Sequence, residues 1–430
     1  MFDPAAIRVR RYDNGITLLT ERITTVRSAS IGFWIKRGSR DERPDQNGVA
    51  HFVEHMLFKG TADRSPRQIS LEIDSMGGNV DAFTAHELSG YYAQVLDERL
   101  PEAFGLLADL TTSPCFDPEE LDRERGVILE EIAGAEDDPE DVLFEAFQRR
   151  FWEGHALGRP ILGTPATVSG FGRDDLCTWM DGIGASDMVI SAAGNLDHEE
   201  VADLVGERLG GLVAGVPRAA RTSPIASPHV QTIARDLEQV QLYVAGPGPV
   251  LSDADRYAAH LLNTLLGGGV SSRLFQTIRE ERGLAYNVYS SMASYSDTGY
   301  VWIGAGTRPQ SAAVVFDLIE VQLQRLCDEP LDVDELTRTK DQVKAGLMLS
   351  LEQTFGRMAN LARQEIGFGR TFSLDEILAS IEAVGVEEIQ QCAQRLFGGA
   401  LSAGCVGSAE AVAGLQKSLD EHPRFGTARS

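Results

Sequence analysis

The sequence has no long hydrophobic run, and this shortage excludes a whole class of proteins. No uninterrupted apolar stretch in the 430 residues reaches the ~18 to 20 residues that a bilayer-spanning helix needs, which argues against an integral membrane protein. The amino terminus mixes Asp3 with Arg8, Arg10 and Arg11 and has no signal-peptide apolar segment. We therefore expect a cytoplasmic protein without a membrane partner.

Basic residues and cysteines are also scarce. Acidic residues outnumber basic ones by 64 to 39, which gives a net charge of −25. Because phosphate backbones are bound by clustered Lys and Arg, this balance argues against a nucleic-acid partner. A solvated acidic exterior is the simplest interpretation, although such a surface would also attract basic ligands. The five cysteines are an odd number without any CxxC pair, which predicts reduced thiols.

Strand and helix patterns are both present in the chain. Residues 30–36 place Ile31, Phe33 and Ile35 on one face, which predicts a strand with one buried side. Residues 48–58 have apolar positions at helical spacing and end with Lys59-Gly60, a typical helix terminus. Similar patterns predict helices at 66–76, 100–112 and 118–133 and strands at 79–84 and 88–96.

The chain contains a weak internal repeat. Residues 49–57 have a degenerate echo at 258–266, and Gly90-Tyr91 recurs as Gly299-Tyr300 at the same offset. A repeat of about half the chain indicates an ancient duplication, so we expect an α+β fold of two duplicated domains, each an antiparallel-rich mixed sheet covered by helices. The Pro-, Ala- and Ser-rich residues 216–228 predict a linker between domains at 1–215 and 229–430.

Metal-site chemistry is confined to the first repeat. His51-Phe52-Val53-Glu54-His55 puts two imidazoles four residues apart on a helix, where both can reach one metal ion. Glu54 projects from the same side and could act on water, as in the HxxEH pattern of the inverzincins. At the matching positions the second repeat has Asn263 and Thr264. The alternative interpretation of the motif is a merely amphipathic helix.

A third ligand is expected because catalytic zinc commonly takes two histidines and a carboxylate. Glu124 and Glu131 lie two turns apart on the later helix, and Glu130 is a nearby rival. All three could equally belong to a solvated acidic face. Spacing alone does not choose among them.

Longer segments resemble a known family. GVAHFVEHMLFKGT (48–61), GGNVDAFTAHELSGYY (77–92), RERGVILEE (123–131), LGRPILGT (157–164) and GGGVSSRLFQTIREERGLAYNVYS (267–290) resemble the pitrilysin and insulin-degrading-enzyme family of zinc peptidases. The resemblance covers nearly the whole chain. Within the family, the likeness is greatest to bacterial relatives of the beta subunit of mitochondrial processing peptidase.

The resemblance implies a role for individual residues. His51, His55 and Glu131 would bind one Zn²⁺ per chain, Glu54 would be the general base, and Glu124 would orient a ligand or the water. The segment Asn79, Asp81, Ala82, Phe83 and Thr84 would belong to an edge strand that pairs with extended substrate, and Arg279 and Tyr286 would stabilise the tetrahedral intermediate. Many family members have Asn where this chain has Asp81, so the bonding at that position differs.

The resulting prediction is a zinc metalloendopeptidase that cleaves unstructured peptides or presequence-like segments. Since family members enclose substrates between four such domains, we expect a dimer with a closed chamber, either a homodimer or a heterodimer with a related chain. The main alternative is a non-catalytic binding or assembly subunit of the same fold, and a third is a metal-dependent hydrolase of other substrates.

Overall fold

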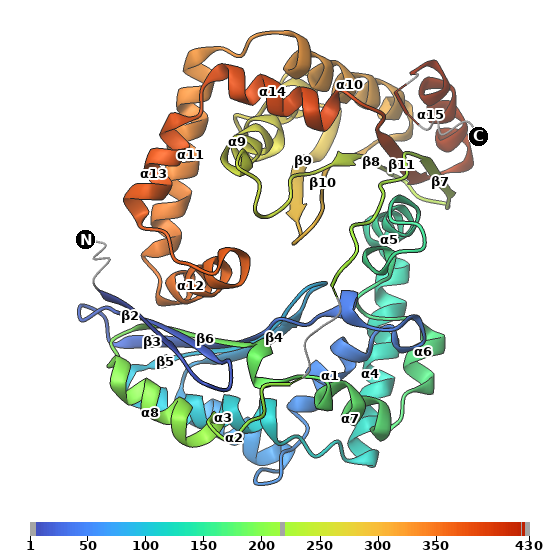
Figure 1. The fold of residues 1–430 in the computed structure, drawn as a ribbon. Coiled ribbons are helices and arrows are strands. Elements are labelled where there is room, and N and C mark those ends of the chain that lie inside the picture. The colour runs from blue at the N-terminus through green and yellow to red at the C-terminus, as the bar shows by residue number, and fades with distance from the viewer. Residues whose placement is uncertain (1–5, 216–219, 423, 426–430) are drawn as a thin grey trace. The chain divides into compact units, whose positions relative to one another are not determined.

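The computed structural model describes residues 6–215, 220–422 and 424–425 of the chain (Figure 1). These residues form two compact units. Of the described residues, unit 1 comprises 6–134, 159–215, 220 and 348–373, and unit 2 comprises 135–158, 221–347, 374–422 and 424–425. Each unit is built on one mixed sheet covered by helices. The predicted α+β fold of two similar domains is therefore confirmed.

Unit 1 contains a six-stranded sheet in the order β1-β2-β6-β3-β5-β4. Only β2 and β6 run parallel, and the other neighbouring pairs are antiparallel. The strand β4 lies at one edge and pairs with β5 alone. The strands are β1 (Ile7–Arg11), β2 (Thr17–Arg22), β3 (Ser28–Ile35), β4 (Asn79–Thr84), β5 (Ser89–Leu96) and β6 (Met188–Gly194).

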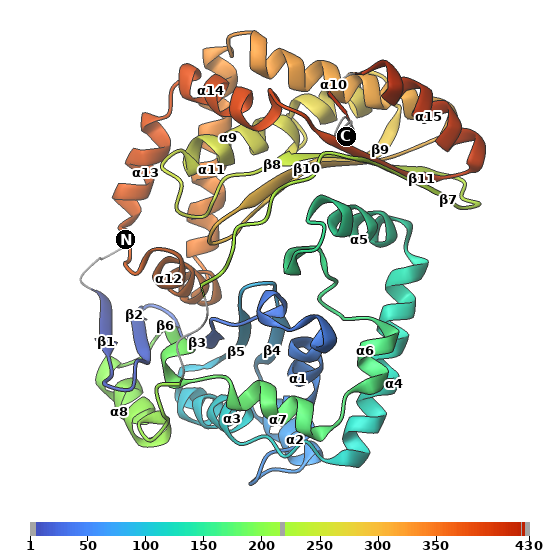
Figure 2. The same cartoon turned by 45° about the vertical axis from the view of Figure 1, so that its right-hand side comes forward.

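Helices cover both faces of this sheet. Phe33 packs on Phe104 of α3 in the main core, whereas Trp34 points to the other face and packs with Met358 of α12. The prediction of one buried side for the strand at 30–36 is therefore wrong, because α12 covers the second face (Figures 1 and 2). The helices are α1 (Val49–Leu57), α2 (Pro66–Met76), α3 (Leu100–Thr112), α4 (Pro118–Asp137), α6 (Pro165–Gly170), α7 (Arg173–Asp181), α8 (His198–Leu209) and α12 (Thr354–Phe368).

Unit 2 repeats the same plan with one strand fewer. Its sheet has the order β7-β11-β8-β10-β9, in which only β7 and β11 are parallel. The strands are β7 (Val230–Ala234), β8 (Val240–Pro247), β9 (Ala285–Ser294), β10 (Gly299–Thr307) and β11 (Ser402–Gly407). The helices are α5 (Pro139–Phe151), α9 (Arg256–Gly267), the π-helix η7 (Phe275–Glu280), α10 (Ala312–Asp328), α11 (Val333–Leu351), α13 (Leu374–Ala383), α14 (Val386–Phe397) and α15 (Ala409–Glu421).

Each unit includes one helix from the other half of the sequence. The helix α12 lies on β2, β3 and β6 of unit 1, and α5 lies on β7, β8 and β11 of unit 2. The compact units thus differ from the continuous domains expected at 1–215 and 229–430. Of the expected linker, residues 216–219 lie outside the described residues, and residues 220–228 form neither helix nor strand.

A buried ion pair anchors α12 to the sheet. The guanidinium of Arg357 donates to the carboxylate of Glu21 on β2, whose side chain is 2% exposed. Burial raises the pKa of Glu21, against the lowering effect of Arg357.

Replacing Arg357 with Met should leave that buried carboxylate without its cation. We expect the free energy of unfolding to fall by about 3–5 kcal/mol, as is typical when one partner of a buried pair is removed. The exposed pair Arg43–Asp45 offers a control, since Arg43→Met removes only an ion pair that solvent screens and should destabilise the fold far less. Urea unfolding of both variants measures the difference, and equal losses would contradict the anchoring role.

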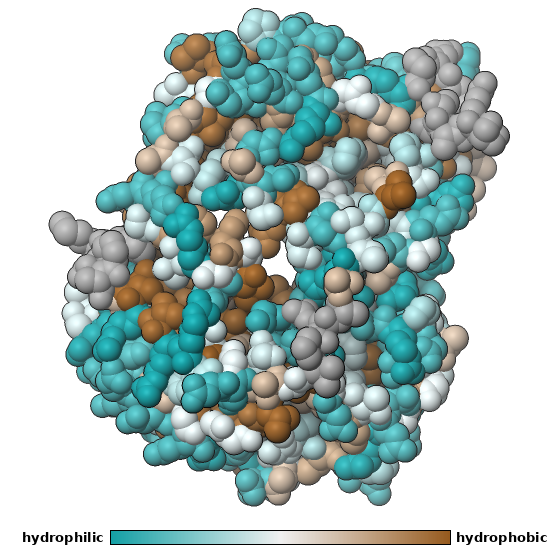
Figure 3. All heavy atoms as spheres, in the orientation of Figure 1, coloured by the Kyte–Doolittle hydropathy of each residue, from teal (hydrophilic) through white to brown (hydrophobic). Residues whose placement is uncertain are grey.

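The face drawn in Figure 3 is mostly hydrophilic, with hydrophobic residues in scattered groups. Among the described residues, no helix combines the length and the apolar composition required to cross a bilayer. The five cysteines are unpaired, as predicted.

Candidate metal centre

The two histidines of the HxxEH motif lie side by side on α1. The helix contains Phe52, Val53 and Met56 in its buried face, and these apolar side chains fix it against the core of unit 1. The rings of His51 and His55 stand with centroids 4.7 Å apart. The i, i+4 spacing therefore brings both imidazoles to one side of α1, as predicted.

The long helix α4 brings a carboxylate to the same place. The Oε2 atom of Glu131 is 3.7 Å from Nε2 of His51 and 3.6 Å from Nε2 of His55. One ligand atom from each of these three residues lies within 4.8 Å of the other two, and Glu130 does not belong to the group. Of the three glutamates that spacing left open, Glu131 is the one that the fold brings to Nε2 of both histidines.

The arrangement fits a tetrahedral zinc ion. With bonds of ~2.0–2.1 Å, the ligand atoms of such an ion lie about 3.4 Å apart, close to the separations from Glu131. Burial, followed by the neighbouring His55, lowers the pKa of His51 to about 4, so this imidazole is neutral at pH 7, as a metal ligand must be. Two histidines and one carboxylate are also the ligand set of many catalytic zinc sites.

A second carboxylate, that of Glu124, contacts the Nδ1 side of the His55 ring. The Oε2 atom of Glu124 lies 3.1 Å from Nδ1 of His55, and Lys59 contacts Oε1 of Glu124 at 2.7 Å. A carboxylate on the far ring nitrogen fixes the tautomer that leaves Nε2 free for a metal. Glu124 thus lies where a residue orienting a ligand is expected. Lys59 was predicted only to end the helix, and its contact with Glu124 depends on packing between α1 and α4.

The expected general base lies beside the edge strand. The hydroxyl of Thr84, the last residue of β4, donates to Oε2 of Glu54. Burial raises the pKa of Glu54, while the hydrogen bond from Thr84 opposes the rise. A carboxyl with a raised pKa is better matched to proton transfer near neutral pH.

The segment predicted to pair with substrate forms the free edge of the sheet. Val80 and Ala82 of β4 pack on the main core, and Phe83 packs with Trp34 on the face that α12 covers. The exposed Asp81 accepts a hydrogen bond from Tyr92 at 3.2 Å. The strand is thus held through one edge and both faces, and its other edge is open within unit 1.

Comparisons with known proteins point to one family of peptidases. The model of the family described as "Insulinase (Peptidase family M16)" matches residues 17–165, and that of the "Peptidase M16 inactive domain" matches residues 172–343. An uncharacterized zinc protease of Streptomyces coelicolor is 39% identical over 401 residues, which cover 91% of this chain and 87% of that protein. The uncharacterized zinc protease YmxG of Bacillus subtilis is 38% identical, with 90% and 96% covered.

This chain belongs to peptidase family M16. The resemblance drawn from the sequence motifs is therefore confirmed at the level of the family. The M16 fold is seen in solved structures as well. A protease from Helicobacter pylori superposes with a TM-score of 0.86 at 18% identity, covering 94% of this chain and all of that one. A peptidase M16 inactive domain from Pseudomonas fluorescens gives 0.87 at 19% identity, with 94% and 98% covered.

Two predicted site residues of this M16 chain lie in unit 2. The guanidinium carbon of Arg279 is 5.0 Å from the ring centroid of Tyr286 and 4.7 Å from that of Phe275. Tyr286 is 80% exposed and lies at the start of β9. The two side chains therefore form one cation–π pair within unit 2, and their action on substrate stays a prediction.

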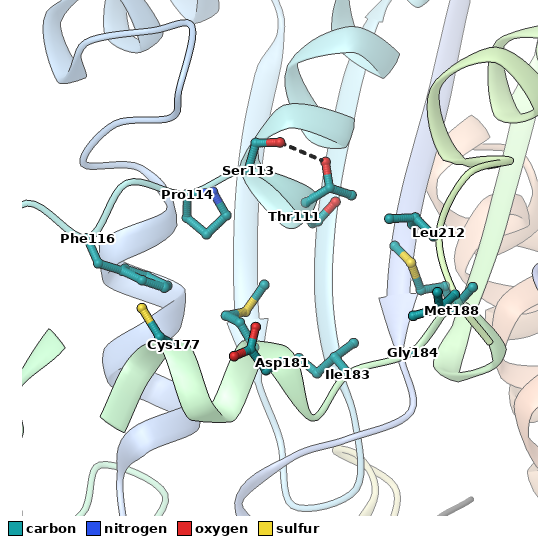
Figure 4. Close-up of a pocket in the computed structure, with 14 residues that line it drawn as sticks. Thr111, Ser113, Pro114, Phe116, Cys177, Asp181, Ile183, Gly184, Met188 and Leu212 are labelled. Atoms are coloured by element: carbon teal, nitrogen blue, oxygen red, sulfur yellow. Dashed lines mark hydrogen bonds between the residues drawn. The ribbon is translucent and has the colours of Figure 1, made fainter. Parts of the chain in front are cut away.

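A pocket elsewhere in unit 1 is separate from the candidate metal ligands His51, His55 and Glu131. It has a volume of about 250 Å³ and is lined by fourteen residues that include Thr111, Phe116, Cys177 and Asp181 (Figure 4). None of the fourteen is His51, His55 or Glu131. The chemistry of the ligand set, not the presence of a cavity, therefore identifies the candidate centre.

Proposed function

We propose that this M16 chain is a zinc-dependent endopeptidase that cleaves extended, unstructured peptides. The observation that carries the proposal is the convergence of His51, His55 and Glu131 beside Glu54 and the free edge of β4. The name zinc protease given to its relatives supports the choice of metal. One zinc ion per chain is proposed, because one such group of ligands is found among the described residues.

Catalysis would divide between the metal and the side chains around it. When bound, zinc supplies a Lewis acid that polarises the peptide carbonyl and acidifies water. Glu54 takes a proton from the attacking water and delivers it to the leaving amine. Glu124 holds the His55 ring through Nδ1. Arg279 and Tyr286 are proposed to stabilise the charge of the tetrahedral intermediate, as a cation and a phenol can.

Substrate would bind as an added strand at β4. The residues Asn79 to Thr84 pair with β5 on one side only, so their outer backbone groups can pair with a peptide. Backbone pairing gives affinity with little demand on sequence, while Asp81 adds a carboxylate that favours basic peptides. In a folded protein most backbone groups are already paired, and exposed strand edges are usually short or protected, which supports a preference for unstructured peptides or presequence-like segments.

We further propose a dimer that encloses the substrate in a chamber. The proposal follows from the two repeats of this chain and the four such domains around substrates in the family. A homodimer is the simpler form, and a heterodimer with a related chain is the alternative. The mass in solution, measured together with the activity of the chain expressed alone, tests both, since activity from one gene product excludes an obligate unlike partner.

The test of the function uses the full chain and an unstructured peptide containing Lys and Arg. We expect one zinc ion per chain, cleavage of the peptide, loss of cleavage with a chelator and recovery when zinc is returned. Zinc with an intact peptide would favour a hydrolase of other substrates. A chain that binds the peptide but no zinc would instead be a non-catalytic binding subunit.

The Thr84 hydroxyl should set the acidic limit of activity. Its hydrogen bond favours the ionised form of Glu54, so Thr84→Val should raise the pKa of that carboxyl. Glu54 must be ionised to act as a base, so we expect the acidic limb of kcat/KM against pH to move upward by about one unit. Thr84→Ser keeps the donor and should keep the wild-type profile. If the acidic limb of kcat/KM against pH is the same in the wild type and both variants, this role of Thr84 is contradicted.

A further inference from the structure

A buried carboxylate lies at the amino-terminal end of the metal-binding helix. Glu42 is 5% exposed, and none of the site residues considered so far contacts it directly. Its Oε2 accepts from the backbone N–H of Gly48 at 2.9 Å and from the side-chain amide of Asn47 at 3.1 Å, while Oε1 accepts from the N–H of Ala50 at 2.9 Å. Burial raises the pKa of Glu42 to about 7, against these hydrogen bonds and Arg159.

Glu42 supplies what the helix start lacks. The first N–H groups of a helix have no partner within it, and the residue before the helix usually accepts one of them through its side chain. Here that residue is Gly48, which has no side chain and makes no such bond. The carboxylate of Glu42, six positions upstream, takes this role, and its negative charge also suits the positive end of the helix dipole.

Glycine is required at position 48 because a loop touches the backbone there. Gly48 has φ +94°, and an added Cβ would lie 2.6 Å from the Cα of Gly163. Gly163 has φ +82°, and its added Cβ would lie 2.6 Å from the carbonyl oxygen of Asn47. The two backbones therefore meet without room for any side chain.

Two hydrogen bonds join the same loop to the Glu42 region. Arg159 donates to the backbone carbonyl of Glu42 at 2.7 Å, and the Asn47 amide donates to the carbonyl of Pro160 at 2.8 Å. Residues 157–164 form the LGRPILGT segment, to which the proposed chemistry assigns no role. Glu42 and this loop hold the start of α1 from two sides.

We propose that Glu42, supported by the loop of residues 159–164, is a positioning residue that sets where His51 and His55 stand relative to Glu131. The proposal rests on the proposed function. The helix α1 has nine residues, about 13 Å, so its start moves together with both histidines. Metal–ligand distances tolerate shifts of only ~0.2 Å, so a small displacement of α1 weakens metal binding.

The central variant is Glu42→Gln in the full chain. The substitution keeps the size of the side chain and removes its negative charge. The glutamine NH₂ group would also replace one acceptor oxygen and face the N–H donors that Glu42 now accepts from. We expect zinc affinity, measured by chelator competition, to fall about 10- to 100-fold, the usual loss for residues that support metal ligands. The kcat of peptide cleavage should fall while KM changes little, because β4 is untouched.

Thr20→Val is the matched control for stability alone. It keeps the shape of a buried side chain on β2 and removes the hydrogen bond between Thr20 Oγ1 and Nδ1 of His198 on α8. The three proteins are compared at a temperature where all are folded. If Glu42→Gln keeps the zinc affinity and kcat of Thr20→Val, the carboxylate only stabilises the fold and the proposal is wrong.

Two further measurements make the result decisive. If Glu42→Gln does not fold, Arg159→Gln removes the hydrogen bond from the loop and the cation near Glu42, while the Glu42 carboxylate stays in place. A smaller loss of zinc affinity then supports the proposal, whereas no loss overturns it. Hydrogen exchange of the metal-free chain tests the positioning of α1 by Glu42 without zinc. Glu42→Gln should speed the exchange of the amide hydrogens in residues 49–57 and leave the exchange in β5 unchanged. If the wild type binds no zinc, the proposed function is wrong. If Glu42→Gln leaves hydrogen exchange in α1 unchanged, the positioning role of Glu42 is wrong, whatever the outcome for the proposed function.

Discussion

Replacing Glu54 with Gln is expected to lower the rate of peptide cleavage by about 10²- to 10⁴-fold, the usual contribution of a general base. Gln has the shape of Glu but cannot take a proton from water. Its carbonyl oxygen can still accept the hydrogen bond from Thr84, so the local structure should persist. The measurement is kcat for an unstructured peptide at saturating zinc.

This variant also separates catalysis from metal binding. Glu54 does not belong to the group of possible ligands, so zinc content should stay at the wild-type value. Glu130→Gln, an exposed change of the same kind on α4, should leave the rate unaltered. A Glu54→Gln protein that retains more than a tenth of the wild-type rate would exclude Glu54 as the base.

Replacing Glu131 with Gln is expected to have the largest effect on metal binding. It removes the charge of one of three proposed ligands, so the loss of zinc affinity should exceed the ~10- to 100-fold typical of supporting residues. Zinc at 100 times its Kd should stabilise the wild-type fold by about 2.7 kcal/mol, and this gain should fall to about 0.4 kcal/mol or less in the variant at the same concentration. Thermal unfolding with and without zinc measures it.

Glu130→Gln is again the matched control, because it changes the neighbouring residue on the same helix. The fold brings only Glu131 to the two histidines, so Glu130→Gln should bind zinc like the wild type. The reverse result, with zinc lost in Glu130→Gln and retained in Glu131→Gln, would refute the assignment.

The sequence predicted the local parts of this molecule well. The helix at 66–76 and the strand at 79–84 have the predicted bounds, because Ser65 and Gly77 mark the ends of that helix within its own few residues. The helix from Pro118 runs to Asp137, beyond the predicted 133, because Gly134 stays within the helix and does not adopt the positive φ of a terminating glycine. The periodicity of apolar residues involves only residues close in the sequence, so these helices and strands could be predicted without a structure.

Contacts between segments that are distant in the sequence could not be predicted in this way. The exchange of α5 and α12 between units depends on which sheet face each helix covers, and helical periodicity does not name that face. Glu42 lies outside every predicted helix and strand, and its role depends on Gly48 and Gly163 meeting across more than a hundred residues.

The sequence by itself determined the family, the α+β repeat and the pair of histidines on one side of a short helix, because motif order and i, i+4 spacing are properties of the chain. Glutamate spacing left the third ligand open, and Glu131 was implied only by the family resemblance. Only the tertiary structure showed which of the neighbours Glu130 and Glu131 stands at the histidines. These neighbours differ by about 100° around α4, and the packing of α4 against α1 turns one of them to the histidines.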